Sequence, residues 1–263
     1  MKTHRWMAWL LAAGGLALAG AAWDAGAAFE APTRAIADAI ASPDRPPADR
    51  EQDARRKAEA ILAFLSVGPG MHVIDVFSAG GYYSELLSRV VGADGGVIAY
   101  NNPPYAKFAA KGIAARYAGE RLPNVRQITS TIEELELAPA SLDAALFVMS
   151  YHDLYWRPVD GSWPPTDPAL LLRKLKAALK PGGVVVVQDH VATPGGDAAQ
   201  VVDALHRIDP ALVKRDFEQA GFVPDGESAI LANPGDDHSK LVFDESIRGR
   251  TDQFVLRYRK PRE

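Results

Sequence analysis

The chain has 263 residues, of which 48% are hydrophobic and 24% charged, and its formal net charge is −4. This length supports one domain with a full hydrophobic core and is short for two. The slight acidic excess excludes the overall positive field of a typical nucleic-acid-binding protein, and the absence of cysteine excludes disulfides and a lipid anchor on an N-terminal cysteine.

The N-terminus has the pattern of a targeting segment. Two basic side chains occur in the first five residues, and residues 6–22 are apolar and uncharged. Ala25-Gly26-Ala27 then fits a small-x-small cleavage site, so we predict a signal peptide over residues 1–27. An uncleaved membrane anchor is the alternative. The sequence thus predicts a periplasmic or secreted protein, with no stable membrane span after cleavage.

Residues 28–47 are rich in Ala, Pro and Asp and are predicted to form an N-terminal arm, with a short helix from Thr33 to Ile40. A single domain over residues 48–263 is expected to follow. Asp49 is the expected cap of a longer helix that ends at Gly68-Pro69-Gly70.

Apolar runs and helical patterns then alternate along the chain. Strands are predicted at residues 72–77, 96–101, 125–128, 144–150 and 184–188, from residue 222 onward and at 254–258, and helices from residue 82 and at 105–117, 168–179 and 210–220. This alternation predicts a doubly wound α/β fold with a mostly parallel seven-stranded sheet and an antiparallel C-terminal edge.

Residues 73–84 encode a strand, a tight turn and a helix. The apolar strand contains Asp75, small residues follow as far as Gly81, and a helical pattern begins at Tyr82. Doubly wound proteins use this arrangement to bring the backbone close to a nucleotide-like ligand. We therefore expect the ligand site at the carboxyl ends of the first strands.

This arrangement resembles the class I S-adenosylmethionine-dependent methyltransferases, from about Ala58 to the C-terminus. Three further features occur in the order typical of that family: Asn101 lies 26 residues after Asp75 (101 − 75), Ser141-Leu142-Asp143 precedes the fourth strand, and Leu179-Lys180-Pro181-Gly182-Gly183 precedes the fifth. Together with the signal peptide, the motif Tyr151-His152-Asp153-Leu154 resembles an exported branch of predicted methyltransferases.

The resemblance implies S-adenosyl-L-methionine as the cofactor. It implies contacts from six positions, which are Asp75, Ser78, Ala79, Gly81, Asn101 and Thr131. The family's first loop reads GxGxG, whereas here only the third glycine, Gly81, is unchanged. Asn101 and Thr131 stand where the family usually has acids for the ribose and the adenine. A neutral acceptor binds a hydroxyl without charge assistance, so Asn101→Asp is expected to strengthen cofactor binding.

Acceptor-side chemistry is expected where the fourth and fifth strands end. Tyr151, His152 and Asp153 directly follow the fourth strand and are the predicted catalytic residues. His152 is predicted to act as a base near neutral pH, with Asp153 orienting it or binding a substrate amine. Capping of the strand and of the next turn is the alternative.

Asp189 and His190 end the fifth strand, and a metal site of His190 and His152 with Asp189 or Asp153 is an alternative interpretation. The sequence spacing does not demand a metal, and none is predicted.

The predicted function is methyl transfer to a small molecule or a cell-envelope component. The alternative is a non-catalytic exported binding protein that kept the fold. A nicotinamide-dependent dehydrogenase is disfavoured because no GxGxxG follows the first strand. The sequence leaves open the substrate, the acceptor atom and the oligomeric state.

Overall fold

The computed structural model describes residues 33–263, and the predicted signal peptide, residues 1–27, lies outside them. Seven strands form one sheet in the order β3-β2-β1-β4-β5-β7-β6. The strands are β1 (His72–Val76), β2 (Gly96–Asn101), β3 (Val125–Thr129), β4 (Leu142–Val148), β5 (Leu179–His190), β6 (Val223–Ser228) and β7 (Gln253–Arg259). The pairs among β1 to β5 are parallel, whereas β7 runs antiparallel to β5 and β6. The predicted fold class is confirmed.

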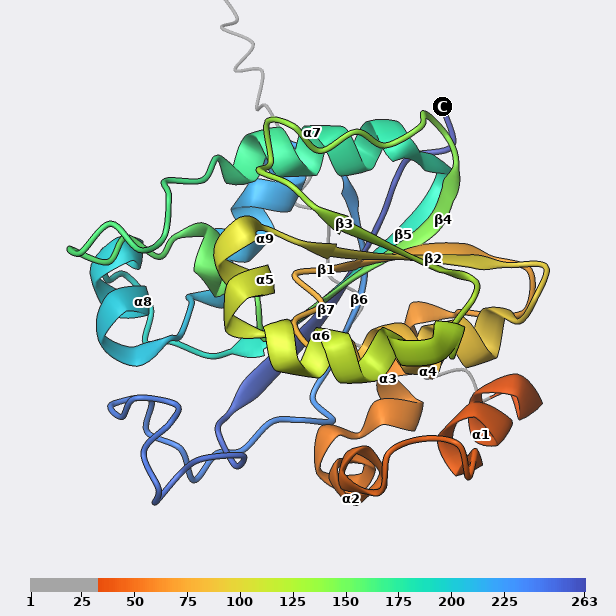
Figure 1. Ribbon diagram of the computed structural model, residues 1–263. Helices are drawn as coiled ribbons and strands as arrows, with labels where there is room; N and C mark the ends of the chain where they lie inside the picture. The colour runs from red at the N-terminus through yellow and green to blue at the C-terminus, as the bar shows by residue number, and fades with distance from the viewer. Residues whose placement is uncertain (1–32) are drawn as a thin grey trace, which may run out of the picture.

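Helices cover both faces of the sheet, as Figure 1 shows with α7 above it and α3 and α4 below. The helices are α1 (Arg34–Ala41), α2 (Pro47–Arg56), α3 (Ala58–Leu65), α4 (Tyr82–Val91), α5 (Pro103–Phe108), α6 (Ala110–Tyr117), α7 (Pro168–Ala178), α8 (Ala198–Leu205) and α9 (Pro210–Gln219), with short 3₁₀ turns η1 (Ala118–Glu120) and η2 (His152–Leu154).

Strand β1 shows how the sheet divides two cores. Ile74 and Val76 are buried against side chains of α7 and α9, whereas Val73 is buried against α1, α3 and α4. Both faces of β1 are thus buried, which explains its apolar residues on both faces, Val73, Ile74 and Val76. Because β1 and β4 lie side by side at the centre, their carboxyl ends open onto one edge, where the ligand site of such sheets lies.

The N-terminal segment departs from the sequence prediction. One continuous helix after Asp49 was expected, but Lys57 adopts a left-handed conformation (φ 50°) that separates α2 from α3. Asp49 lies inside the first turn of α2, where its carboxylate accepts a hydrogen bond from Arg116 at 2.5 Å. It is therefore a tertiary contact and not a cap.

The described part of the predicted arm packs against the domain. Ile36 and Ala39 of α1 are buried in the core beside α4. The guanidinium of Arg45 is also buried and donates two hydrogen bonds of 2.7 Å to Asp53. A buried charge needs such a partner, so this pair anchors the segment from residue 33 onward.

Three smaller differences concern element boundaries. The helix predicted at residues 105–117 divides at Ala109 into α5 and α6, and α8 had not been predicted. Strand β4 ends at Val148 because Met149 turns to a positive φ of 51°. Within residues 33–263, no helix is long and apolar enough to cross a membrane.

Candidate functional site

The loop between β1 and α4 keeps a glycine-loop backbone with two non-glycine residues. Phe77, Ala79 and Gly81, which occupy the three glycine positions of the GxGxG pattern, have φ values of 54°, 47° and 79°. A left-handed conformation costs a non-glycine residue about 1–2 kcal/mol. Such strain persists where surrounding structure enforces it, often at functional sites.

Asn101, at the end of β2, closes this loop. Its Oδ1 accepts a hydrogen bond from Ala79 N at 2.9 Å, and its Nδ2 donates to Ser78 Oγ at 3.1 Å and Ala79 O at 3.2 Å. Both ends of the amide are therefore engaged by the loop. The structure assigns Asn101 to holding the loop in shape, in place of the ribose contact expected from the sequence.

Two other residues predicted to contact the cofactor form hydrogen bonds with side chains of the protein. Asp75 is buried and accepts a 2.6 Å hydrogen bond from Ser84 Oγ, and burial raises its pKa to about 7. Thr131 exchanges hydrogen bonds with Glu134, which follows it by three residues in a turn after β3. The loop backbone around Gly81 is thus the more direct candidate for ligand contact.

Aromatic rings cover the first glycine position. Phe77 stacks on Tyr105 of α5 with ring centroids 5.4 Å apart, and Trp163 meets both rings edge-on, at 6.2 Å from Phe77 and 5.3 Å from Tyr105. Phe77 is consequently buried. A side chain at this position requires neighbours that shield it, and Tyr105 and Trp163 supply that shield.

Two buried N–H donors beside Tyr105 have no partner among the described residues. One is Nδ2 of Asn102, whose Oδ1 caps α5 by accepting from Tyr105 N, and the other is Nε1 of Trp163. A buried donor without an acceptor costs about 1–3 kcal/mol. The donor of Asn102 therefore suits a ligand that presents a hydrogen-bond acceptor at the end of β2, whereas the unpaired donor of Trp163 weakens the burial of its own ring.

A buried group of charges lies where β4 and β5 end. Asp189, at 0% exposure, receives hydrogen bonds from His152 N at 2.9 Å and His190 N at 2.7 Å, and contacts His152 Nδ1 at 2.8 Å. The other ring nitrogen of His152, Nε2, lies 3.5 Å from Asp153 Oδ1. Tyr105 Oη donates to Asp153 Oδ2 at 2.6 Å, which joins this group to the aromatic cluster.

The electrostatics of the group make His152 a cation. Burial alone would lower its pKa, but the negative charges of Asp153 and Asp189 outweigh burial and raise the pKa of His152 to about 9. Burial alone would raise the pKa of Asp189, but the charge and hydrogen bonds of His152 outweigh burial and lower that pKa. Asp189 therefore stays ionised. Burial raises the pKa of Asp153. An imidazolium at neutral pH does not suit the predicted role of proton acceptor.

Two more histidines lie near His152, with ring centroids 6.1 Å away for His190 and 5.6 Å for His206. Burial lowers the pKa of His190 to about 4, and its Nδ1 lies 2.7 Å from Thr251 Oγ1. In the part of the chain that the structure describes, no group of three or more His, Cys, Asp or Glu side chains has the arrangement of a metal site.

Tyr151 faces away from this group, contrary to its predicted catalytic role. Its ring is fully buried between Phe147 and Phe217, and its Oη donates to Asp216 at 2.8 Å. The turn at η2 sends His152 and Asp153 toward β5 and α5 but leaves Tyr151 in the core. Tyr151 is therefore a packing residue.

Sequence reasoning had missed the roles of three residues. Asp189 was considered only as a metal ligand, although its place at the end of a parallel strand beside β4 could have indicated a contact with His152. Tyr105 was treated only as the start of a helix. Trp163 lies in a segment without periodicity, and no local pattern indicated that it points inward.

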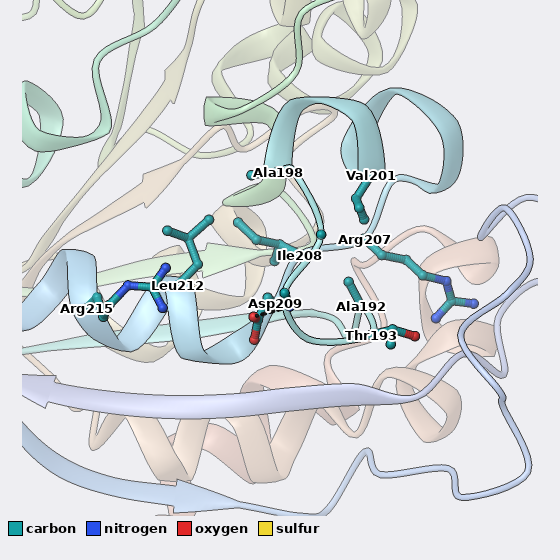
Figure 2. A pocket seen from close by; sticks show the side chains of 11 residues that line it. Ala192, Thr193, Ala198, Val201, Arg207, Ile208, Asp209, Leu212 and Arg215 are labelled. Carbon is teal, nitrogen blue, oxygen red and sulfur yellow. Dashed lines mark hydrogen bonds between the residues drawn. The ribbon is translucent and has the colours of Figure 1, made fainter.

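A separate cavity of about 200 Å³ lies between the loop after β5, α8 and α9. Figure 2 shows Asp209 and Leu212 on one side, with Arg207 extending away from them. None of the predicted site residues lines it.

Comparisons with known proteins place the fold. No family model matches the chain. The carboxy-S-adenosyl-L-methionine synthase of Trichlorobacter lovleyi is 23% identical over 168 residues, which make up 64% of this chain. The match spans only 61% of that synthase's length.

Solved structures match over more of the chain. An S-adenosylmethionine-dependent methyltransferase from Aquifex aeolicus has a TM-score of 0.57 and 19% identity, covering 81% of this chain and 94% of its own. The 1,6-didemethyltoxoflavin-N1-methyltransferase of Burkholderia thailandensis, solved with S-adenosylhomocysteine, has a TM-score of 0.50 and 19% identity, covering 82% and 81%. The [4+2]-cyclase SpnF has a TM-score of 0.57 and 17% identity, covering 86% and 91%. The chain therefore has the class I methyltransferase fold, which also occurs in a cyclase.

The contacts of Asn101 reverse one expectation. Asn101→Asp replaces a donor by a carboxylate that faces the carbonyl of Ala79, so we expect a loss of about 2 kcal/mol in the free energy of unfolding. Urea denaturation measures this loss. Asn102→Asp is the matched control, because it keeps the cap on α5 and removes only an unpartnered donor. Equal stability of the two variants would contradict the assigned role.

The raised pKa of His152 predicts pH-dependent stability. The folded state holds this proton more tightly than the unfolded chain, whose histidine pKa is about 6.5. The stabilisation is therefore complete below about pH 6.5 and is lost as the pH rises through about 9. We expect the free energy of unfolding to fall between pH 7 and 9, by roughly 1–3 kcal/mol, and to fall less in His152→Gln. The exposed His72→Gln should behave as the wild type, and a flat wild-type profile would contradict the charged pair.

Proposed function

We propose that this chain is an S-adenosylmethionine-dependent methyltransferase that acts on a small molecule or a cell-envelope component. The observation that carries the proposal is the buried group His152, Asp153 and Asp189 at the ends of β4 and β5, beside the glycine-like loop. In doubly wound folds this edge is where a ligand meets reactive side chains. The class I methyltransferase fold of the chain supports the assignment.

The residues near β1 and β2 fit such a cofactor in two respects. The loop keeps the backbone conformation of a glycine loop at Phe77, Ala79 and Gly81, and Nδ2 of Asn102 is a buried donor without a partner among the described residues. When bound, the cofactor supplies an electrophilic methyl group. Ser78, Ala79 and Gly81 would hold it through the backbone. Asn101 keeps the loop in shape, Asp75 ties β1 to α4 through Ser84, and Thr131 lies in the turn after β3.

The acceptor side follows from the charges. Asp153 combines a raised pKa with a position beside Tyr105 Oη, so it suits the role of proton acceptor. Asp153 would take the proton from the acceptor's O–H or N–H bond as that atom gains the methyl group. The electron pair of the broken S–CH3 bond would stay on sulfur, in the leaving S-adenosylhomocysteine. His152 remains a cation that stabilises the charge of the Asp153 carboxylate, and Asp189 holds the imidazole through Nδ1.

The aromatic cluster keeps a second function open. Phe77, Tyr105 and Trp163 pack together where the family's loop has glycine, and a chain that had lost the cofactor would have this appearance. The alternative is therefore a binding protein on a methyltransferase fold. Binding of S-adenosylhomocysteine, measured by calorimetry, distinguishes the two functions.

Asp153→Asn tests the proton acceptor. We expect turnover to fall by ~10²–10⁴-fold, because an amide cannot take the proton, with little change in affinity for S-adenosylhomocysteine. Release of S-adenosylhomocysteine from S-adenosylmethionine in cell-envelope and small-molecule extracts measures turnover. Asp160→Asn, on the exposed surface, is the control. Full turnover in Asp153→Asn would contradict this role.

Export is part of the proposal, and it rests on the N-terminal pattern of residues 1–27. Mass spectrometry of the protein from its native cells should find an N-terminus at or within a few residues of Ala28. An intact N-terminus in a cytoplasmic fraction would contradict export.

A further inference from the structure

Trp163 is a buried side chain in an otherwise exposed segment. Residues 155–167, here called the lid, connect η2 to α7 and form the green loop that projects to the left in Figure 1. Ser162 and Pro164 on either side are exposed, whereas Trp163 is 6% exposed. One ring of the lid therefore reaches inward, onto Phe77.

The lid holds itself together without polar contacts at its tip to the rest of the domain. Within residues 33–263, the hydrogen bonds of residues 158–165 stay inside the lid, with Gly161 N donating to Pro158 O and Ser162 N to Asp160 Oδ1. At its base, Arg157 donates to Thr166 O at 2.8 Å. Trp163 can leave the domain without breaking a hydrogen bond, because ring packing alone holds it there.

The contacts of the buried Trp163 ring are incomplete. Its Nε1 is buried and has no acceptor among the described residues. An unpaired buried donor offsets part of the free energy gained by burying the ring. The base of the lid is fixed to the domain, by Thr166 Oγ1 donating to Leu154 O at 2.6 Å and Trp156 Nε1 to Asp203 at 3.1 Å. The Trp163 ring itself is held only by packing against other aromatic rings, and the space that it fills suits a more polar occupant.

We propose that Trp163 is a plug that occupies the place of the cofactor's methionine end over Phe77, and that cofactor binding displaces it. This inference rests on the proposed function. Phe77 stands at the first glycine position, in the tight turn of the ligand-binding loop, and Trp163 lies against its ring with centroids 6.2 Å apart. The plug therefore competes with the cofactor and lowers its apparent affinity by the fraction of molecules that are closed.

Removing the plug should strengthen binding. In the full chain, we expect Trp163→Ala to bind S-adenosylhomocysteine at least about tenfold more tightly than the wild type by calorimetry, a gain of ~1.4 kcal/mol. Val159→Ala is the control, because it removes an apolar side chain from the same lid that is fully exposed. Trp156 is unsuitable as a control, because its ring packs on that of Trp163 with centroids 5.3 Å apart. We expect the affinity of Val159→Ala to change by less than about twofold.

Fluorescence reports on the ring directly. The difference in emission between Trp156→Phe and the double variant Trp156→Phe/Trp163→Phe isolates Trp163. S-adenosylhomocysteine should shift this emission to longer wavelength and increase its quenching by acrylamide, because the indole becomes exposed. Circular dichroism of each variant checks that it is folded.

The outcomes separate the two proposals. Equal or weaker binding by folded Trp163→Ala, with binding retained by the wild type, overturns the plug and leaves the cofactor assignment in place. A shift of Trp163 emission to shorter wavelength on binding overturns it too. Absence of binding in the wild type and in every variant overturns the proposed function together with the plug. Binding by Trp163→Ala alone supports both.

Discussion

The rest of the site depends on the contact between the buried carboxylate of Asp189 and the ring of His152. The carboxylate receives hydrogen bonds from the backbone of His152 and His190 and holds the His152 ring at Nδ1. A carboxylate inside a protein must be balanced by charge and hydrogen bonds, and here one imidazolium supplies most of that balance. Asp189 thereby joins the end of β5 to the turn after β4.

Several features follow from this one contact. The ring of His152 is fixed with Nε2 toward Asp153, and Asp153 in turn is positioned against Tyr105. The lid begins from the same turn, since Tyr155 N donates to His152 O and Trp156 N to Asp153 O. The charge state of His152 and the starting point of the lid therefore depend on a residue 37 positions away in sequence.

The sheet could be predicted from the sequence because its central strands β4 and β5 contain long apolar runs, and turn residues separate the strands. Strand β1 also has both faces buried, so every position from Val73 to Val76 had to be compatible with burial. The break at Lys57 could not be predicted, because the residues around it all favour a helix and the tertiary contacts of α1 and α2 decide it.

The sequence predicts where the candidate site lies but not its contacts. Asp75 in the first strand and His152 and Asp189 near the ends of the fourth and fifth strands predict that it lies at the carboxyl ends of the strands, and the structure brings His152 and Asp189 together there. The partner of His152 depends on the register in which Val148 pairs with Gln188, and no local pattern specifies that register. The contacts of Asn101 could not be predicted either, because they depend on how the tertiary fold places Ser78 and Ala79 within hydrogen-bonding distance of its amide.

The order of the strands has a consequence for synthesis. Strand β6 is attached to the sheet only through β7, which follows it in the chain, and β7 is also the neighbour of β5. While the ribosome has yet to complete β7, β6 has no place in the sheet, and β5 exposes an unpaired edge. Nascent chains with such an edge aggregate readily and are held open by chaperones. The closing of this sheet is therefore a late event, because it waits for β7, which alone joins β6 to the sheet and covers the edge of β5.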